Sequence, residues 1–131
     1  MNEIFEGKTI LMVDDEELNW LLFKDSLDDL PAEFVWARVA QEAIDLVSSG
    51  RKIDLILMDI KMPIKDGYTA TREIKEINPM IPVIAQTAYA SPEEHFRCLR
   101  AGCNDYISKP ISFQELKIKM RKMLQSESVK P

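Results

Sequence analysis

The chain has 131 residues, of which 46% are hydrophobic and 30% are charged, and its formal net charge is −5. This length suits one compact domain with a single core. The acidic balance argues against direct binding of this domain to nucleic acid or to a membrane surface. The apolar runs are too short for a transmembrane helix, which needs about 20 residues.

Targeting and redox signals are equally sparse. Residues 1–7 lack the basic and apolar regions of a secretory signal peptide. Cys98 and Cys103 are too few and too close together for a disulfide framework. We therefore expect two reduced thiols and a cytoplasmic location.

Short apolar runs alternate with segments of helical spacing along the whole chain. The apolar runs predict strands at residues 9–13, 33–37, 54–58, 81–86 and 104–107. The segments between and after them predict helices at about residues 16–30, 40–49, 66–78, 91–101 and 112–124. Ser91 and Ser112 are each followed three residues later by a glutamate, which is the pattern of a capping box. The first helix is expected to have an apolar face made by Leu18, Leu21, Leu22 and Leu27.

Five consecutive strand–helix units favour a parallel sheet with right-handed crossovers and helices on both faces. At this length the expected fold is a flavodoxin-like, doubly wound (βα)5 α/β domain with strand order 2-1-3-4-5 and three α/β/α layers. The first and last helices would cover one face, and the three middle helices the other. We expect an N-terminal extension at residues 1–7, the domain at 8–125 and a flexible tail at 126–131.

Carboxylates follow two of the apolar runs. Asp14 and Asp15 come after the first run, and Asp59 comes after the third. A carboxylate within a buried strand would be costly, so we place all three at the carboxyl edge of the sheet, where α/β folds bind ligands. Their mutual repulsion is relieved by a divalent cation or by protonation of one member.

The fourth and fifth strands bring two further groups to the same edge, the Thr87 hydroxyl and the Lys109 ammonium. Carboxylates, a hydroxyl and a cation suit Mg²⁺ and a phosphoryl group. Each residue alone has an ordinary explanation: Asp14 and Asp15 could cap a helix, and Lys109 could be a surface lysine. The functional interpretation is favoured because all of these side chains are expected at one edge.

The chain resembles the response-regulator receiver domains of two-component signalling over about residues 8–125. The motifs that carry the resemblance are Val13-Asp14-Asp15-Glu16, Met58-Asp59-Ile60-Lys61-Met62-Pro63, Asp66-Gly67, Thr87-Ala88 and Tyr106-Ile107-Ser108-Lys109-Pro110. Each motif alone is weak, but all of them occur in the order that this family shows.

The resemblance implies a role for each matching residue. Asp59 corresponds to the phosphoacceptor, a nucleophile that takes a phosphoryl group from a partner's phosphohistidine. Asp15 corresponds to a direct ligand of Mg²⁺, or of Mn²⁺ in its place, and Asp14 to a ligand that acts largely through water. Asp59 and the backbone carbonyl of Lys61 would complete the protein ligands. As an isolated domain, the chain would catalyse only its own phosphorylation and dephosphorylation.

Four more residues correspond to the family's switch. Lys109 would pair with a phosphoryl oxygen, and a cis bond before Pro110 would aim it into the site. Thr87 would bond another phosphoryl oxygen, and Tyr106 would turn inward behind it. The readout would be the surface of the fourth helix, the fifth strand and the last helix.

Several details resemble receivers attached to hybrid histidine kinases, including Ala101-Gly102-Cys103-Asn104-Asp105-Tyr106. Lys61 and Tyr89 occupy variable positions and are expected to flank the path of the attacking water and to slow loss of the phosphoryl group. Gln86 is polar where the family commonly has an apolar residue. His95 is the only histidine, which excludes a histidine-centred metal site, and we expect it to face solvent.

The resemblance implies a histidine kinase or a histidine phosphotransfer domain as partner, and possible contact with an output domain or protein. We expect a monomer or a weak dimer, and the parent could be a membrane-anchored sensor kinase. A stand-alone single-domain regulator and a docking module that is never phosphorylated are alternatives. A haloacid-dehalogenase-type phosphohydrolase also uses an aspartate, Mg²⁺ and a lysine, but its Asp-x-Asp motif is absent from the first strand.

Overall fold

Five strands and five α-helices alternate in the computed structural model, which describes residues 2–89 and 91–128, with side chains to residue 125. The strands are β1 (Thr9–Val13), β2 (Glu33–Ala37), β3 (Leu55–Asp59), β4 (Val83–Thr87) and β5 (Asp105–Ser108). The helices are α1 (Glu17–Ser26), α2 (Ala40–Ser48), α3 (Gly67–Ile77), α4 (Pro92–Ala101) and α5 (Phe113–Ser128), after a short 3-10 helix, η1 (Glu3–Phe5).

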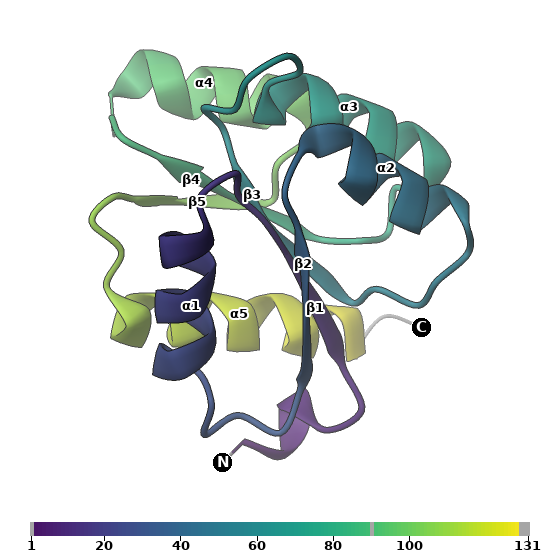
Figure 1. Ribbon diagram of the computed structural model, residues 1–131, viewed down its shortest axis with the longest axis vertical. Coiled ribbons are helices and arrows are strands. Elements are labelled where there is room, and N and C mark those ends of the chain that lie inside the picture. Colours follow the sequence, from purple (N-terminus) through teal and green to yellow (C-terminus); the bar gives the residue numbers. More distant parts are fainter. Residues whose placement is uncertain (1, 90, 129–131) are drawn as a thin grey trace.

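The strands form one parallel sheet in the order β2-β1-β3-β4-β5, which confirms the predicted topology. Helices α1 and α5 cover one face of the sheet, and α2, α3 and α4 cover the other (Figure 1). The three layers and their assignment to the two faces are therefore as the sequence predicted.

Each central strand contributes to two hydrophobic cores, because successive side chains of a strand point to opposite faces. In β1, Leu11 and Val13 face the core under α2–α4. Ile10 and Met12 face the core under α1 and α5. This double burial explains why the central strands are continuous apolar runs rather than alternating patterns.

The first helix differs from its predicted form. It ends at Ser26, and Leu18, Leu21 and Leu22 are 74%, 52% and 54% exposed. Leu27 is buried as predicted, and Phe23, which was not predicted, is buried with it. The predicted apolar face of this helix was therefore wrong at Leu18, Leu21 and Leu22, which are more than half exposed.

Helical segments among the described residues extend into both of the segments that were predicted to flank the domain. Phe5 of η1 is fully buried in the core with α5, so the N-terminal extension packs against the domain. The backbone of α5 continues as a helix to Ser128, into the predicted tail, whose residues 129–131 lie outside the described residues. Every helix among the described residues is too short or too polar to cross a membrane.

Candidate functional site

Three carboxylates meet at the carboxyl edge of the sheet. Asp14 follows β1, Asp59 is the last residue of β3, and Asp15 lies beside Asp14. One oxygen from each carboxylate lies within 4.8 Å of the others. Asp14 is 0% and Asp59 is 3% exposed, whereas Asp15 faces solvent. The structure thus brings together the three predicted carboxylates, with the strand of Asp59 ending one residue later than expected.

Asp14 is held by two residues that were not among the predicted site residues. The indole of Trp36 donates a 2.9 Å hydrogen bond to the Asp14 carbonyl, and the side-chain amide of Asn19 donates to both carboxylate oxygens, at 3.3 and 3.2 Å. Trp36 comes from β2 and stacks on Trp20 of α1 with ring centroids 5.6 Å apart. Asn19 lies five residues after Asp14, and this spacing across the strand–helix turn could have indicated the contact.

Asp59 carries a direct cationic partner. The Lys109 ammonium lies 3.0 Å from Asp59 Oδ1, and the peptide bond between Lys109 and Pro110 is cis. The backbone N–H of Lys61 donates to the same oxygen at 3.3 Å. One carboxylate oxygen of Asp59 is thus held by a lysine and a backbone amide.

Burial has the largest effect on the pKa values of Asp14 and Asp59. It raises the pKa of Asp59 above its usual value, against the opposing effect of the Lys109 ammonium. Burial likewise raises the pKa of Asp14, and the charge of Asp59 raises it further. A divalent cation would relieve this cost, because it favours the ionised form of both groups.

Of the predicted switch residues, Thr87 is the last residue of β4 and Tyr106 lies within β5. The Thr87 hydroxyl donates to the Tyr89 carbonyl at 3.0 Å and accepts from the Tyr89 N–H at 3.2 Å. Tyr106 is half-buried, and exposed His95 packs edge-on against its ring with centroids 4.8 Å apart. The Thr87 hydroxyl therefore makes hydrogen bonds, as donor and as acceptor, with the backbone of Tyr89.

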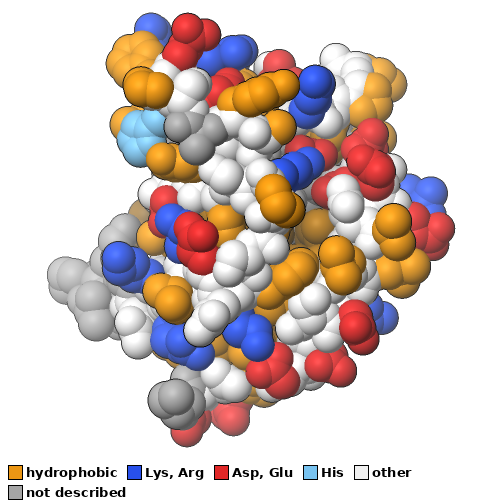
Figure 2. Space-filling view, turned by 90° about the vertical axis from the view of Figure 1, so that its left-hand side faces the viewer, with side chains coloured by type: hydrophobic (Ala, Val, Ile, Leu, Met, Phe, Trp, Pro, Cys, Tyr) orange, Lys and Arg blue, Asp and Glu red, His pale blue; other side chains and the backbone are white. Residues whose placement is uncertain are grey.

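A cleft of about 330 Å³ opens above Asp59, and Lys61, Thr87, Tyr89 and Lys109 all line it. Figure 2 views this side of the molecule, where the β4–α4 and β5–α5 loops lie; hydrophobic side chains gather near its middle, with charged side chains between them.

Three further residues, which the sequence did not indicate as site residues, line this cleft. Glu94 accepts a 2.6 Å hydrogen bond from Tyr68, and Arg97 stacks on the Tyr68 ring with its guanidinium 4.8 Å from the centroid. Burial and the bond to Glu94 raise the pKa of Tyr68. These residues come from α3 and α4, so both helices help to shape the approach to Asp59.

Comparisons with known proteins identify the family of this chain. The family model described as "Response regulator receiver domain" matches residues 10–121. The chain therefore belongs to the response regulator receiver domain family and is a receiver domain of two-component signalling. Receiver domains of this family interact with histidine kinases or phosphotransfer proteins.

Individual relatives are similar over most of their length. The polar-differentiation response regulator DivK of Brucella anthropi is 42% identical over 107 residues, which are 80% of this chain and 86% of the relative. A CheY-like receiver domain protein from Methanospirillum hungatei JF-1 has a TM-score of 0.84 and 30% identity, and the match covers 92% of this chain and 96% of that one.

A third relative is informative about metal binding. The receiver domain of a sensor histidine kinase from Pseudomonas aeruginosa PAO1 has a TM-score of 0.81 and 34% identity, over 91% of this chain and 98% of that one. Its crystal structure has a magnesium ion coordinated in the active-site cleft. The oxygen-only cluster of Asp14, Asp15 and Asp59 suits the same ion, because Mg²⁺ prefers hard oxygen ligands.

Proposed function

We propose that Asp59 is the phosphoacceptor of this receiver domain and takes a phosphoryl group from a partner's phosphohistidine. The observation that carries the proposal is the 3.0 Å contact between Asp59 and Lys109, beside Asp14 and Asp15. A transferred phosphoryl group needs its oxygens neutralised by cations and hydrogen-bond donors. The Lys109 ammonium and the Lys61 N–H are two such donors.

Asp14, Asp15 and Asp59 would hold Mg²⁺, together with the backbone carbonyl of Lys61. The bound ion would neutralise phosphoryl oxygens during transfer. Asn19 and Trp36 support this arrangement, because their hydrogen bonds hold Asp14 in place without adding charge.

Phosphorylation would shift the domain between two conformations. In the proposed switch, the Thr87 hydroxyl leaves the Tyr89 backbone and bonds a phosphoryl oxygen, and Tyr106 turns inward behind it. The changed surface would comprise α4, β5 and α5. The edge contact between His95 and Tyr106 supports a readout there, because turning the Tyr106 ring would break a contact with α4.

Lys61 and Tyr89 would slow hydrolysis of the phosphorylated aspartate. Both line the cleft above Asp59, and Tyr89 is 68% exposed at its mouth. Tyr89→Ala is expected to speed phosphate loss several-fold, because it uncovers the path of the attacking water. Phe96→Ala, which removes an exposed aromatic ring outside this cleft, is the matched control. Unchanged or slower phosphate loss in Tyr89→Ala would contradict the role.

We further propose a histidine kinase or a histidine phosphotransfer domain as the phosphodonor, with a hybrid histidine kinase as the parent protein. The similarity to receivers of sensor histidine kinases supports this parent, whereas the similarity to DivK supports a single-domain response regulator. Profiling phosphotransfer from purified kinases and phosphotransfer domains distinguishes them. If a kinase core is encoded with this domain, fast transfer from that core supports the hybrid. Fast transfer only from a separately encoded donor supports the single-domain regulator.

The central proposal is tested by incubation with acetyl phosphate and Mg²⁺, followed by intact-mass measurement. The wild type is expected to gain the mass of one phosphoryl group, and Asp59→Asn is expected to lose this adduct. Asp66→Asn is the matched control: Asp66 lines the same cleft, and asparagine preserves its capping bond to the Thr69 N–H. An adduct that persists in Asp59→Asn would refute the assignment, and absence of any adduct would favour a docking module.

A further inference from the structure

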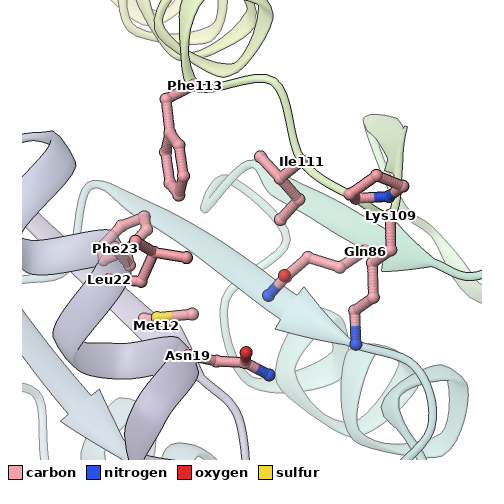
Figure 3. Close-up of a pocket in the computed structure, with 9 residues that line it drawn as sticks. Met12, Asn19, Leu22, Phe23, Gln86, Lys109, Ile111 and Phe113 are labelled. Atoms are coloured by element: carbon pink, nitrogen blue, oxygen red, sulfur yellow. The ribbon is translucent and has the colours of Figure 1, made fainter.

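A second cavity, of about 300 Å³, lies between α1 and the segment that joins β5 to α5 (Figure 3). Its walls are mostly apolar, with Leu22 and Phe23 on the α1 side and Ile111 and Phe113 on the other. Small-molecule sites are typically concave, mostly apolar cavities from about 300 Å³ upward, with a few polar groups. The size and the lining of this cavity fit the lower end of that class.

Gln86 supplies an unpaired polar group to this cavity. Its side chain is 2% exposed, and its Nε2 atom has no hydrogen-bond partner among the described residues. In Figure 3 the Gln86 amide points into the cavity. A buried amide donor without an acceptor is costly, because it has lost its bonds to water. The cavity therefore offers a strong donor to any ligand with an acceptor at this place.

Asn19 offers a complementary acceptor. Its Nδ2 atom donates to both oxygens of the Asp14 carboxylate, at 3.3 and 3.2 Å. A carboxylate only accepts hydrogen bonds, so the Asn19 nitrogen is fixed toward Asp14 and its Oδ1 atom is turned the other way. Figure 3 shows this oxygen on the side of the cavity. The polar end of the cavity thus presents one donor and one acceptor.

The charges around this polar end favour a neutral ligand. The Asp14 carboxylate lies directly behind Asn19. The ammonium of Lys109, which also borders the cavity, is already paired with Asp59. An anionic head group would therefore approach a carboxylate without gaining an unpaired cation.

We propose that this cavity binds a small molecule with an apolar body and a neutral amide-type head group. The ligand carbonyl accepts from Gln86 Nε2, the ligand N–H donates to Asn19 Oδ1, and the apolar body packs between Phe23, Ile111 and Phe113. Gln86 and Lys109 line both this cavity and the cleft above Asp59, so the two sites are neighbours. Binding of a ligand in this cavity is nevertheless measured on the unphosphorylated chain, so its outcome does not depend on phosphorylation of Asp59.

The test uses three probes of nearly equal shape in ¹H–¹⁵N NMR titrations of the full chain: phenylacetamide, phenylacetone and phenylacetate. Phenylacetone lacks the N–H donor, and phenylacetate replaces the amide by a charge. We expect phenylacetamide to bind with a Kd on the order of 1 mM, a value typical of so few atoms. Saturable shifts should occur at the Gln86 side-chain amide and at Ile111 and Phe113. Phenylacetone and phenylacetate should each bind at least about fivefold more weakly.

Two variants localise the binding. Gln86→Leu replaces the donor by an apolar side chain of similar volume. It should weaken the binding of phenylacetamide at least about fivefold. Leu22→Trp enlarges a half-exposed side chain at the α1 wall and should block the cavity without touching the buried core. If the NMR shifts do not saturate at a phenylacetamide concentration of about 10 mM, the proposal is overturned, because the expected Kd is on the order of 1 mM. Equal or tighter binding of phenylacetone or phenylacetate, or shifts that neither variant alters, would also overturn it.

Discussion

The ammonium of Lys109 lies 3.0 Å from Oδ1 of Asp59, although 50 residues separate them in the chain. Lys109 follows β5 and Asp59 ends β3, and β4 lies between these two strands in the sheet. The side chain of Lys109 must therefore reach across the end of β4. This contact gives the buried carboxylate a cation before any metal or phosphoryl group is present.

Removing that cation should impair phosphorylation more than folding. Lys109→Met keeps the aliphatic stem and is expected to slow phosphorylation by acetyl phosphate about 10- to 100-fold, because a charge-assisted hydrogen bond contributes about 1.5–3 kcal/mol. The measurement is the rate of adduct formation by intact mass. Lys117→Met, which removes a partly buried lysine paired with Asp29, is the control and should leave the rate unchanged. Equal rates in both variants would argue against a role of Lys109 in phosphoryl transfer.

Gly67 keeps the start of α3 close to the phosphoacceptor strand. A Cβ atom on Gly67 would lie 2.3 Å from the Asp59 carbonyl oxygen and 2.8 Å from the Ile60 Cα. Gly67→Ala should therefore push α3 away from β3 and destabilise the fold by about 1–3 kcal/mol, and it should slow phosphorylation of Asp59. Urea unfolding and adduct formation measure the two effects.

Gly50→Ala is the matched control for that change. Gly50 has a φ of +82° with open space around it, so alanine there strains the backbone by about 1–2 kcal/mol without a clash. We expect Gly50→Ala to lose stability but to phosphorylate normally. If Gly67→Ala were also phosphorylated at the wild-type rate, the close approach of α3 to β3 would not be needed for phosphorylation of Asp59.

Asn19 should influence metal affinity through Asp14. Asn19→Ala removes the hydrogen bonds to both Asp14 oxygens, and loss of such a supporting partner typically weakens metal binding about 10- to 100-fold. Mg²⁺ titration followed by tryptophan fluorescence is a suitable measurement, because Trp36 donates to the Asp14 carbonyl. Gln41→Ala, which removes an exposed amide bonded to Asp45, should not change the affinity. An Mg²⁺ affinity of Asn19→Ala equal to that of the wild type would refute this role.

Burial should protect the thiols at neutral pH. Burial raises the pKa of the Cys103 thiol to about 12, well above the usual range of a thiol, so almost no thiolate is present at pH 8. Iodoacetamide should therefore label Cys103 far more slowly in the native protein than in urea, with mass spectrometry as the readout. Native labelling as fast as that of the unfolded chain would contradict this.

The raised pKa of Cys103 also makes the stability of the folded protein depend on pH. Because the folded pKa is raised, the native state holds the Cys103 proton more tightly than the unfolded chain does. The resulting stabilisation is complete below about pH 9 and is lost as the pH rises toward about 12. The stability difference between the wild type and Cys103→Ala should narrow over that range in urea unfolding.

Local signals in the sequence determined the layers and the strand order. Double burial makes the central strands continuous apolar runs, and capping serines mark the starts of α4 and α5, where Ser91 and Ser112 accept hydrogen bonds from Glu94 and Glu115. The convergence of Asp14, Asp15 and Asp59 could also be predicted, because parallel strands end at a common edge. These features depend on residue type and spacing, which the sequence displays directly.

Only the tertiary structure decided which side chains meet across that edge. Nothing in their spacing indicates that Trp36 bonds the Asp14 carbonyl, or that Glu94 and Arg97 border the cleft above Asp59. The burial of Phe23 in place of three leucines depends on the rotation of α1 against the sheet. The unpaired amide of Gln86 becomes visible only once α1 and the β5–α5 segment leave a cavity around it. Such contacts depend on how separate elements pack together, and packing is a property of the whole fold rather than of any one segment.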